Sequence, residues 1–114
     1  MYQFEGRDWS QLVGGVLESV TFVSNAIDLD FGQWGVTCMN GLTLKIDGRV
    51  ENLVVLPTSA NSLPSLIGAA VESIAVTPKV LRLNLSDSAW IELVDDSVSY
   101  ESYLFRTLDG EVVV

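Results

Sequence analysis

The chain has 114 residues, of which 48% are hydrophobic and 18% charged, and its 15 acidic and 6 basic side chains give a formal net charge of −9. This size and composition predict one folded domain with its own hydrophobic core, and the negative field opposes binding to nucleic acid or an anionic membrane. With no histidine and one cysteine, Cys38, the chain can form neither an internal disulfide nor a histidine-dependent catalytic triad. It has no apolar run near the roughly 20 residues of a membrane span and no signal-peptide pattern at its N-terminus, so we expect a cytoplasmic protein.

Two segments near the starts of the two halves are similar and lie 54 positions apart. Residues 12–20 read LVGGVLESV and residues 66–74 read LIGAAVESI, so leucine, glycine, glutamate and serine coincide in register. Self-similarity at a fixed spacing indicates a duplicated unit. We therefore predict a single domain, residues 1–114, made of two pseudo-repeats of about 8–56 and 62–114 joined by a linker, 57–61.

Each repeat opens with the pattern of a short helix. Asp8 and Ser62 are good N-cap residues, and each precedes a segment that ends at a glycine, Gly14 or Gly68. Glycine closes a helix well because it adopts the left-handed conformation without steric cost. The sequence therefore predicts one short helix at the start of each repeat.

Strand patterns follow in both repeats. Residues 26–31, AIDLDF, align with residues 80–85, VLRLNL, and apolar side chains alternate in both, as in a strand with one buried face. Turn residues come next, and then a further strand. At the same spacing this strand aligns Thr37 with Ile91 and Met39 with Leu93.

Each repeat then ends in a hairpin pattern centred on Asp-Gly, at residues 47–48 and 109–110. The spacing here is 62 rather than 54, so the second repeat carries eight extra residues, placed between about Val94 and Ser102. One repeat has too few strands to cover its own apolar face, whereas two repeats can cover each other. The predicted fold is mainly β (α+β): an internally duplicated β-sandwich or partly open barrel with two short helices.

Aromatic and acidic residues in the second repeat are candidates for a partner-binding surface. If Ile91 points inward, its neighbours point outward, and an exposed tryptophan beside acids is typical of an interface. The first candidate patch is Trp90, Glu92, Asp95, Asp96, Tyr100 and Glu101, and the second is Asp28, Asp30 and Trp34. The alternatives are a solvated charged surface and tryptophans packed against a sheet edge.

Catalysis and metal binding receive little support from the spacing of these acids. Asp28 and Asp30 would be a thin ligand set for calcium or magnesium. Asp95 and Asp96 could be paired with another carboxylate for glycoside hydrolysis, but nothing in their positions demands it. We therefore predict that the protein is not an enzyme and has no catalytic residue, metal site or cofactor.

The repeated pattern L-[VI]-G-x-x-[LV]-E-S-[VI], together with the later YESYL at 100–104 and the closing Asp-Gly, resembles small bacterial proteins found near secreted toxins. The chain is similar to the immunity proteins of polymorphic-toxin and contact-dependent growth inhibition systems. That resemblance implies a cytoplasmic inhibitor that binds one cognate, cationic toxin domain, often a nuclease, and it carries over no catalytic residue. The partner would be a basic protein, not nucleic acid or a membrane.

Two other functions remain open from the sequence. The repeats could hold a small molecule between them, because ligand pockets tend to form where two units meet. The chain could also be an assembly domain that forms a homodimer through an exposed C-terminal edge strand at residues 111–114.

Overall fold

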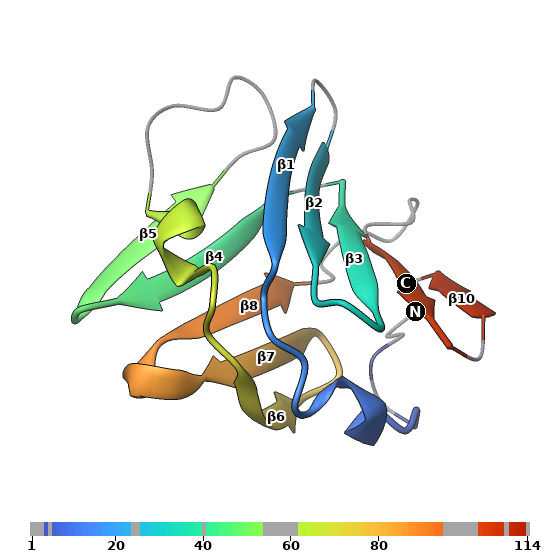
Figure 1. Cartoon of the computed structure of the whole chain (residues 1–114). Helices are drawn as coiled ribbons and strands as arrows, with labels where there is room; N and C mark the ends of the chain where they lie inside the picture. The colour runs from blue at the N-terminus through green and yellow to red at the C-terminus, as the bar shows by residue number, and fades with distance from the viewer. Residues whose placement is uncertain are drawn as a thin grey trace.

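The computed structural model describes residues 4, 6–23, 26–39, 41–53, 62–94, 103–108 and 110–113. Within them the chain forms strands and three short 3-10 turns (Figure 1). The first repeat contains η1 (Ser10–Leu12), β1 (Ser19–Val23), β2 (Ala26–Asp30), β3 (Gly35–Cys38), β4 (Leu42–Ile46) and β5 (Arg49–Leu53). The second contains η2 (Leu63–Leu66), β6 (Val71–Val76), β7 (Val80–Leu85), η3 (Ser86–Ser88), β8 (Trp90–Val94), β9 (Tyr103–Thr107) and β10 (Gly110–Val113).

The strands form two antiparallel sheets of five strands each. Sheet I has the order β1-β2-β3-β9-β10, and sheet II has the order β5-β4-β8-β7-β6. Each sheet thus combines the first three strands of one repeat with the closing hairpin of the other, an exchange visible in the colours of Figure 1. The prediction of a mainly β, sandwich-like fold is confirmed.

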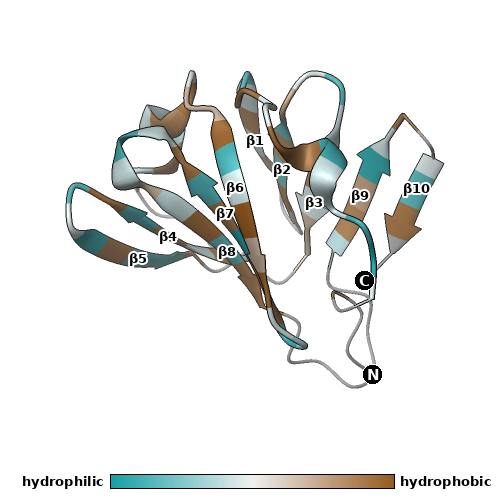
Figure 2. Cartoon of the chain, turned by 90° about the horizontal axis from the view of Figure 1, so that it is seen from below, coloured by the Kyte–Doolittle hydropathy of each residue, from teal (hydrophilic) through white to brown (hydrophobic). Residues whose placement is uncertain are grey.

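The hydrophobic core lies between the two sheets. Hydrophobic and hydrophilic residues alternate along the strands (Figure 2), so each sheet turns one apolar side inward. Leu29 of sheet I and Leu83 of sheet II, which align in the repeat, are both fully buried in one core cluster. Trp9 also belongs to this cluster, and its indole nitrogen donates a hydrogen bond to the Phe4 carbonyl at 2.8 Å. Burial of both inner faces holds the sheets together.

The two repeats meet through backbone hydrogen bonds that are related by two-fold symmetry. The bonds are Leu17 N to Ala69 O (3.0 Å), Val71 N to Gly15 O (2.8 Å), Gly68 N to Leu17 O (2.7 Å) and Gly14 N to Val71 O (2.8 Å). The first two bonds form one symmetry-related pair, and the last two form another. In each pair, adding 54 to the number of the first-repeat residue and subtracting 54 from that of the second-repeat residue converts one bond into the other. The isolated bridge between Val16 and Ala70, also 54 apart, marks the centre.

The predicted short helices are single 3-10 turns, η1 and η2, because segments of three or four residues are too short for a stable α-helix. The Asp8 carboxylate still accepts a hydrogen bond from the Ser10 amide at 2.9 Å, whereas Ser62 makes no side-chain cap bond. Gly14 and Gly68 end the turns with φ of +92° and +98°, as predicted.

The register expected for the third strand of each repeat is wrong by one residue. The turn after β2 closes with a bond from Phe31 N to Trp34 O, and the turn after β7 closes from Leu85 N to Ala89 O. The second turn is therefore one residue longer, and the spacing rises to 55. Because a shift of one residue exchanges the two faces of a strand, Thr37 points outward while its neighbours on both sides are fully buried.

The closing hairpins also differ from expectation. The turn at Asp47 and Gly48 is confirmed, since Ile46 pairs with Arg49. In the second hairpin Thr107 pairs with Gly110, so Gly110 is the first residue of β10 and not part of the turn. The connection between β8 and β9, which contains the predicted insertion, lies outside the described residues.

Candidate functional site

The outward face of sheet I is polar and carries more acid than base. Strand pairing places one row of residues directly opposite one another across the sheet: Ser19, Asp30, Gly35, Arg106 and Glu111. The adjacent outward row contains Thr21, Asp28, Thr37 and Leu104. Three carboxylates against one guanidinium give these rows a formal charge of −2. We call this surface, defined by Asp28, Asp30, Arg106 and Glu111, the acidic face.

A closed triangle of polar side chains fixes the centre of the acidic face. Arg106 donates from Nη2 to Asp28 Oδ1 at 2.7 Å and from Nη1 to Thr37 Oγ1 at 2.6 Å. Thr37 Oγ1 in turn donates to Asp28 Oδ1 at 2.8 Å. The Asp28 and Arg106 side chains are each 40% exposed, so the pair is held in place yet open to solvent.

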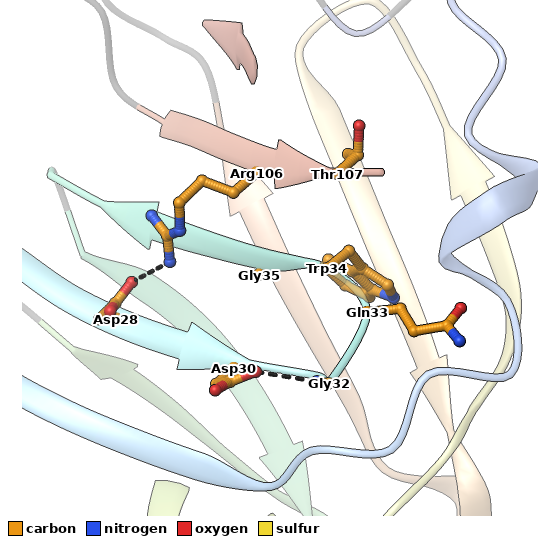
Figure 3. Close-up of a pocket in the computed structure, with 8 residues that line it drawn as sticks. All are labelled: Asp28, Asp30, Gly32, Gln33, Trp34, Gly35, Arg106 and Thr107. Carbon is orange, nitrogen blue, oxygen red and sulfur yellow. Dashed lines mark hydrogen bonds and ion pairs between the residues drawn. The ribbon is translucent and has the colours of Figure 1, made fainter. Parts of the chain in front are cut away.

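Gly35 makes room for this arrangement. A Cβ at Gly35 would lie 2.9 Å from the Leu29 carbonyl oxygen and 3.1 Å from Arg106 Nη2, so a side chain there would displace the guanidinium. The space beside it is a hollow of about 400 Å³. Figure 3 shows its lining, with Arg106 directed at Asp28. The lining residues are Asp28, Asp30, Gly32, Gln33, Trp34, Gly35, Arg106 and Thr107.

Asp30 is held at the edge of this hollow by the turn that follows β2. Its Oδ1 accepts a hydrogen bond from the Gly32 amide at 2.8 Å, a local bond typical of aspartate in turns (Figure 3). A Cβ at Gly32 would lie 2.9 Å from a Glu18 carboxylate oxygen, so a further acid lies beside the same turn. The hollow is therefore bordered by carboxylates on this side.

Trp34 is buried rather than exposed, with 4% of its surface accessible. Its ring stacks on Phe31, with centroids 4.1 Å apart and planes 7° from parallel, and it lies over Gly15. The indole N–H is buried without a hydrogen-bond acceptor in the described part of the chain. Of the two alternatives for this residue, the packed one holds, so Trp34 supports the hollow and offers little surface to a partner.

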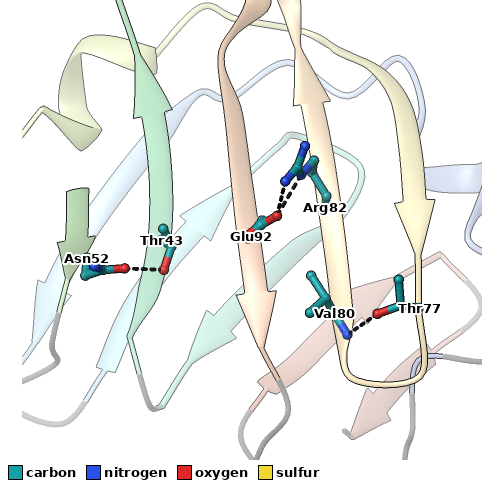
Figure 4. Close-up of polar contacts among 6 residues, drawn as sticks. All are labelled: Thr43, Asn52, Thr77, Val80, Arg82 and Glu92. Carbon is teal, nitrogen blue, oxygen red and sulfur yellow. Dashed lines mark hydrogen bonds and ion pairs between the residues drawn. The ribbon is translucent and has the colours of Figure 1, made fainter. Parts of the chain in front are cut away.

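Trp90 and Glu92 lie on the other outward face, that of sheet II, where both interact with Arg82. Arg82 donates to Glu92 Oε2 from Nε at 2.7 Å and also from Nη2 (Figure 4). Its Cζ lies 4.4 Å from the Trp90 ring centroid. Both residues point outward, as predicted, because Ile91 and Leu93 are fully buried. Within this sheet their charge and ring face are already matched by a cation.

The two candidate patches thus do not form one surface. Asp28 and Asp30 lie on the acidic face of sheet I, and Trp90 and Glu92 lie on the outward face of sheet II. The other four candidates, Asp95, Asp96, Tyr100 and Glu101, lie outside the described residues.

Three residues on the acidic face, Arg106, Glu111 and Gly35, were not among the site residues that the sequence predicted. Arg106 pairs with Asp28 only because the closing hairpin of the second repeat joins sheet I. In the strand pairing of the two hairpins its position matches that of Lys45, whereas alignment of the two Asp-Gly pairs places Lys45 on Thr107, so the sequence alignment did not contain this signal. Gly35 was missed because its role depends on the absence of a side chain beside Arg106.

Cys38 is fully buried, and burial raises the pKa of its thiol far above the ordinary value. It therefore packs as a small apolar side chain, in agreement with its strand pattern. Among the described residues no group of three or more histidine, cysteine or acidic side chains could hold a metal ion. The same part of the chain contains no helix that is long and apolar enough to cross a membrane.

Comparison with known proteins returned no matching family model, no similar curated protein and no similar solved structure.

Proposed function

We propose that the protein binds a basic protein partner through the acidic face and acts as an immunity-type inhibitor of a cationic toxin domain. The observation that supports this most is the acidic face itself, which is ordered and open to solvent. Asp28 and Asp30 line a hollow of about 400 Å³. A surface of this charge attracts basic proteins and speeds their association.

Arg106 has a positioning role in this proposal. It holds the Asp28 carboxylate from one side through a bond of 2.7 Å, while the other side faces solvent. A lysine or arginine of the partner would bind Asp28 and Asp30 with little loss of side-chain entropy, because both carboxylates are already fixed by hydrogen bonds. Glu111, directly opposite Arg106, extends the negative surface along β10.

Inhibition of a toxin would follow from binding if the acidic face mimics the charge of the toxin's substrate. A toxin domain that acts on nucleic acid carries a basic active-site surface, and an acidic protein can cover it by taking the place of the phosphates. The chain's net charge of −9 and its resemblance to immunity proteins favour this role over a structural one. On sheet II, Trp90 and Glu92 would contribute only if Arg82 moved away from them.

The direct test is binding by variants that remove acid from one face at a time. Asp28→Asn with Asp30→Asn keeps oxygen atoms that can accept the same hydrogen bonds but removes two charges from the acidic face. The matched control, Glu72→Gln with Asp87→Asn, removes two charges elsewhere. Proteins captured from producing cells by the wild type would be identified by mass spectrometry, and the association kinetics of the captured partner would be measured for all three proteins.

We expect a basic partner whose association rate falls steeply between about 50 and 300 mM salt. The acidic-face variant should associate about tenfold more slowly, and the control should lose less than about twofold, because screening limits the reach of distant charges. Co-expression with the partner should also protect growth with the wild type and fail with the acidic-face variant. A neutral or acidic partner, or equal losses in both variants, would contradict the proposal.

A further inference from the structure

A second hollow lies at the place in the second repeat that Trp34 fills in the first. The equivalent of Trp34 is Ala89, because each closes the turn after the second strand by the same backbone bond. The equivalent of Gly15, over which the Trp34 indole lies, is Ala69. Ala69 and Ala89 both line an open space of about 360 Å³ beside η2. The small residues at these two positions therefore leave empty the volume that an aromatic ring occupies in the first repeat.

The lining of this hollow combines apolar side chains with the polar residues Ser65 and Ser86, and its border is acidic. Ile46, Leu66 and Ile67 join the two alanines as walls, and Asp47 and Asp87 stand exposed beside them. Residues of both repeats contribute, since Ile46 and Asp47 come from the end of β4 and the hairpin turn that follows it. Among the described lining residues there is no lysine or arginine. A ligand with an apolar body and a positive charge matches this combination.

The packing of Trp34 on Gly15 in the first repeat also indicates how large the apolar part of the ligand can be. A Cβ at Gly15 would clash with the Trp34 indole nitrogen, so an indole in the same pose above Ala69 is excluded by the alanine methyl group. A single six-membered ring has no atom at the position of that nitrogen, and the remaining close approach, equivalent to that of Trp34 Cε2 at 3.2 Å, needs only a small shift of the ring. We propose that this hollow is a binding site for a small primary amine that carries one aromatic ring, with the ring between Ala69 and Ala89 and the ammonium group at Asp47 and Asp87.

The probe for the test is 2-phenylethylamine, with phenylacetate as a ligand of similar size and opposite charge. Both would be titrated into the isotope-labelled protein, and the amide chemical shifts would be followed by NMR. We expect saturable shifts at Ala69, Ala89 and Asp87 with the amine, and a dissociation constant at least tenfold lower than for phenylacetate. Such weak, fragment-scale binding is normal for a ligand with about nine heavy atoms.

Two variants separate the ring from the charge. Ala89→Trp with Ala69→Gly reproduces the pair found in the first repeat and should abolish binding by filling the hollow. Asp47→Asn with Asp87→Asn should weaken amine binding about tenfold and leave phenylacetate no weaker. Both aspartates have positive φ, 51° and 63°, which asparagine also adopts readily, so this variant keeps the turns.

Four results would overturn the proposal. They are no saturable shift at these amides, equal binding of the amine and phenylacetate, retained binding in the filled variant, and unchanged amine binding in the asparagine variant. The site is lined by residues other than those of the acidic face, so either proposal can fail while the other stands.

Discussion

The outward faces of sheets I and II come from equivalent strands of the two repeats, and their charge differs at every charged position except that of Arg106, whose equivalent is Lys45. On sheet II the equivalent rows are Val50, Lys45, Trp90, Asn84 and Ser73, and Asn52, Thr43, Glu92, Arg82 and Ala75. Two bases against one acid give a formal charge of +1 there, compared with −2 on the acidic face. The inward faces, by contrast, are apolar in both repeats. Burial constrains one face of each sheet, and the other face is free to diverge in charge.

Gly35 and Trp90, which are equivalent, show how a single position separates the two faces. Without a side chain at 35, Arg106 lies across the strand toward Asp28 and a hollow remains beside it. With an indole at 90, Arg82 lies over the ring and reaches Glu92 instead. The same strand positions therefore produce an open acidic surface in one sheet and, in the other, a surface on which Trp90 and Glu92 both interact with Arg82.

The largest expected difference between the repeats concerns Trp34 and its equivalent, Ala89. Trp34→Ala removes a stacked, buried ring and should cost about 3–5 kcal/mol of unfolding free energy. Ala89→Gly removes one methyl group and should cost about 1 kcal/mol. Urea unfolding of both variants measures this, and similar losses would contradict the assignment of one filled and one open space.

Trp34→Phe provides the matched control for this comparison. It keeps an aromatic ring that can stack on Phe31 but removes the indole N–H, which is buried without an acceptor in the described residues. Loss of an unsatisfied donor offsets part of the lost ring volume, so we expect a change of about 1 kcal/mol or less. A loss as large as that of Trp34→Ala would show that the indole N–H has a partner.

A smaller effect is expected from Gly35→Ala. The new Cβ would press against the Leu29 carbonyl oxygen and Arg106, which should cost about 1–3 kcal/mol and displace the guanidinium from Asp28. In the equivalent position, Trp90→Ala should release Arg82 without strain in the backbone. The arginine side-chain signals in NMR spectra and urea unfolding measure both changes; an unperturbed Arg106 in Gly35→Ala would argue against its close approach to this strand.

The two arginine ion pairs, Arg106 with Asp28 and Arg82 with Glu92, should differ by less in their contribution to the free energy of unfolding. Arg106→Met breaks a pair that is 40% exposed on both sides, which is worth about 0.2–1 kcal/mol. Arg82→Met removes an ion pair and a contact with the Trp90 ring, so we expect about 0.5 kcal/mol more. Unfolding at low and high salt separates the terms, because screening weakens only the ionic part. A greater loss for Arg106→Met would reverse the comparison.

The smallest effect concerns acid stability at the contact between the repeats. Ser62 donates from its amide and hydroxyl to Glu51 at 2.9 and 2.6 Å, and these bonds lower the pKa of Glu51 from its ordinary value of 4.5. A lowered folded-state pKa gives stability that is present above pH 4.5 and lost as the pH falls below it. Ser62→Ala should therefore flatten the loss of stability on acidification, and Ser65→Ala should not; unfolding at several pH values distinguishes them.

The local features of the fold could be predicted from the sequence, but the long-range ones could not. Alternation in 26–31 and 80–85 predicted two strands, and Gly14 and Gly68 were predicted in the left-handed conformation. The register of Thr37 failed because one extra residue in a turn exchanges the two faces of the following strand. The exchange of hairpins between sheets could not be predicted, because strand pairing between repeats depends on non-local contacts.

Only the part of the candidate site that lies on one strand could be predicted, because the rest also depends on non-local contacts. Asp28 and Asp30 follow from alternation along one strand and point outward, as expected. Arg106 lies 78 residues from Asp28 and meets it only through the pairing of β3 with β9. Trp34 was expected at a turn, but the packing of its ring on Phe31 and over Gly15 depends on how the turn folds back.

Cation binding by the acidic face can be measured by an NMR titration of the labelled protein with a short lysine oligomer. We expect the amide shifts to concentrate on the acidic face, at Asp28, Asp30 and Glu111, and to disappear at high salt. The outward face of sheet II, with Lys45, Arg82 and Glu92, should change little. Equal shifts on both faces, or shifts centred on Glu92, would contradict the proposal that the acidic face binds cations while Glu92 on the equivalent face is already paired with Arg82.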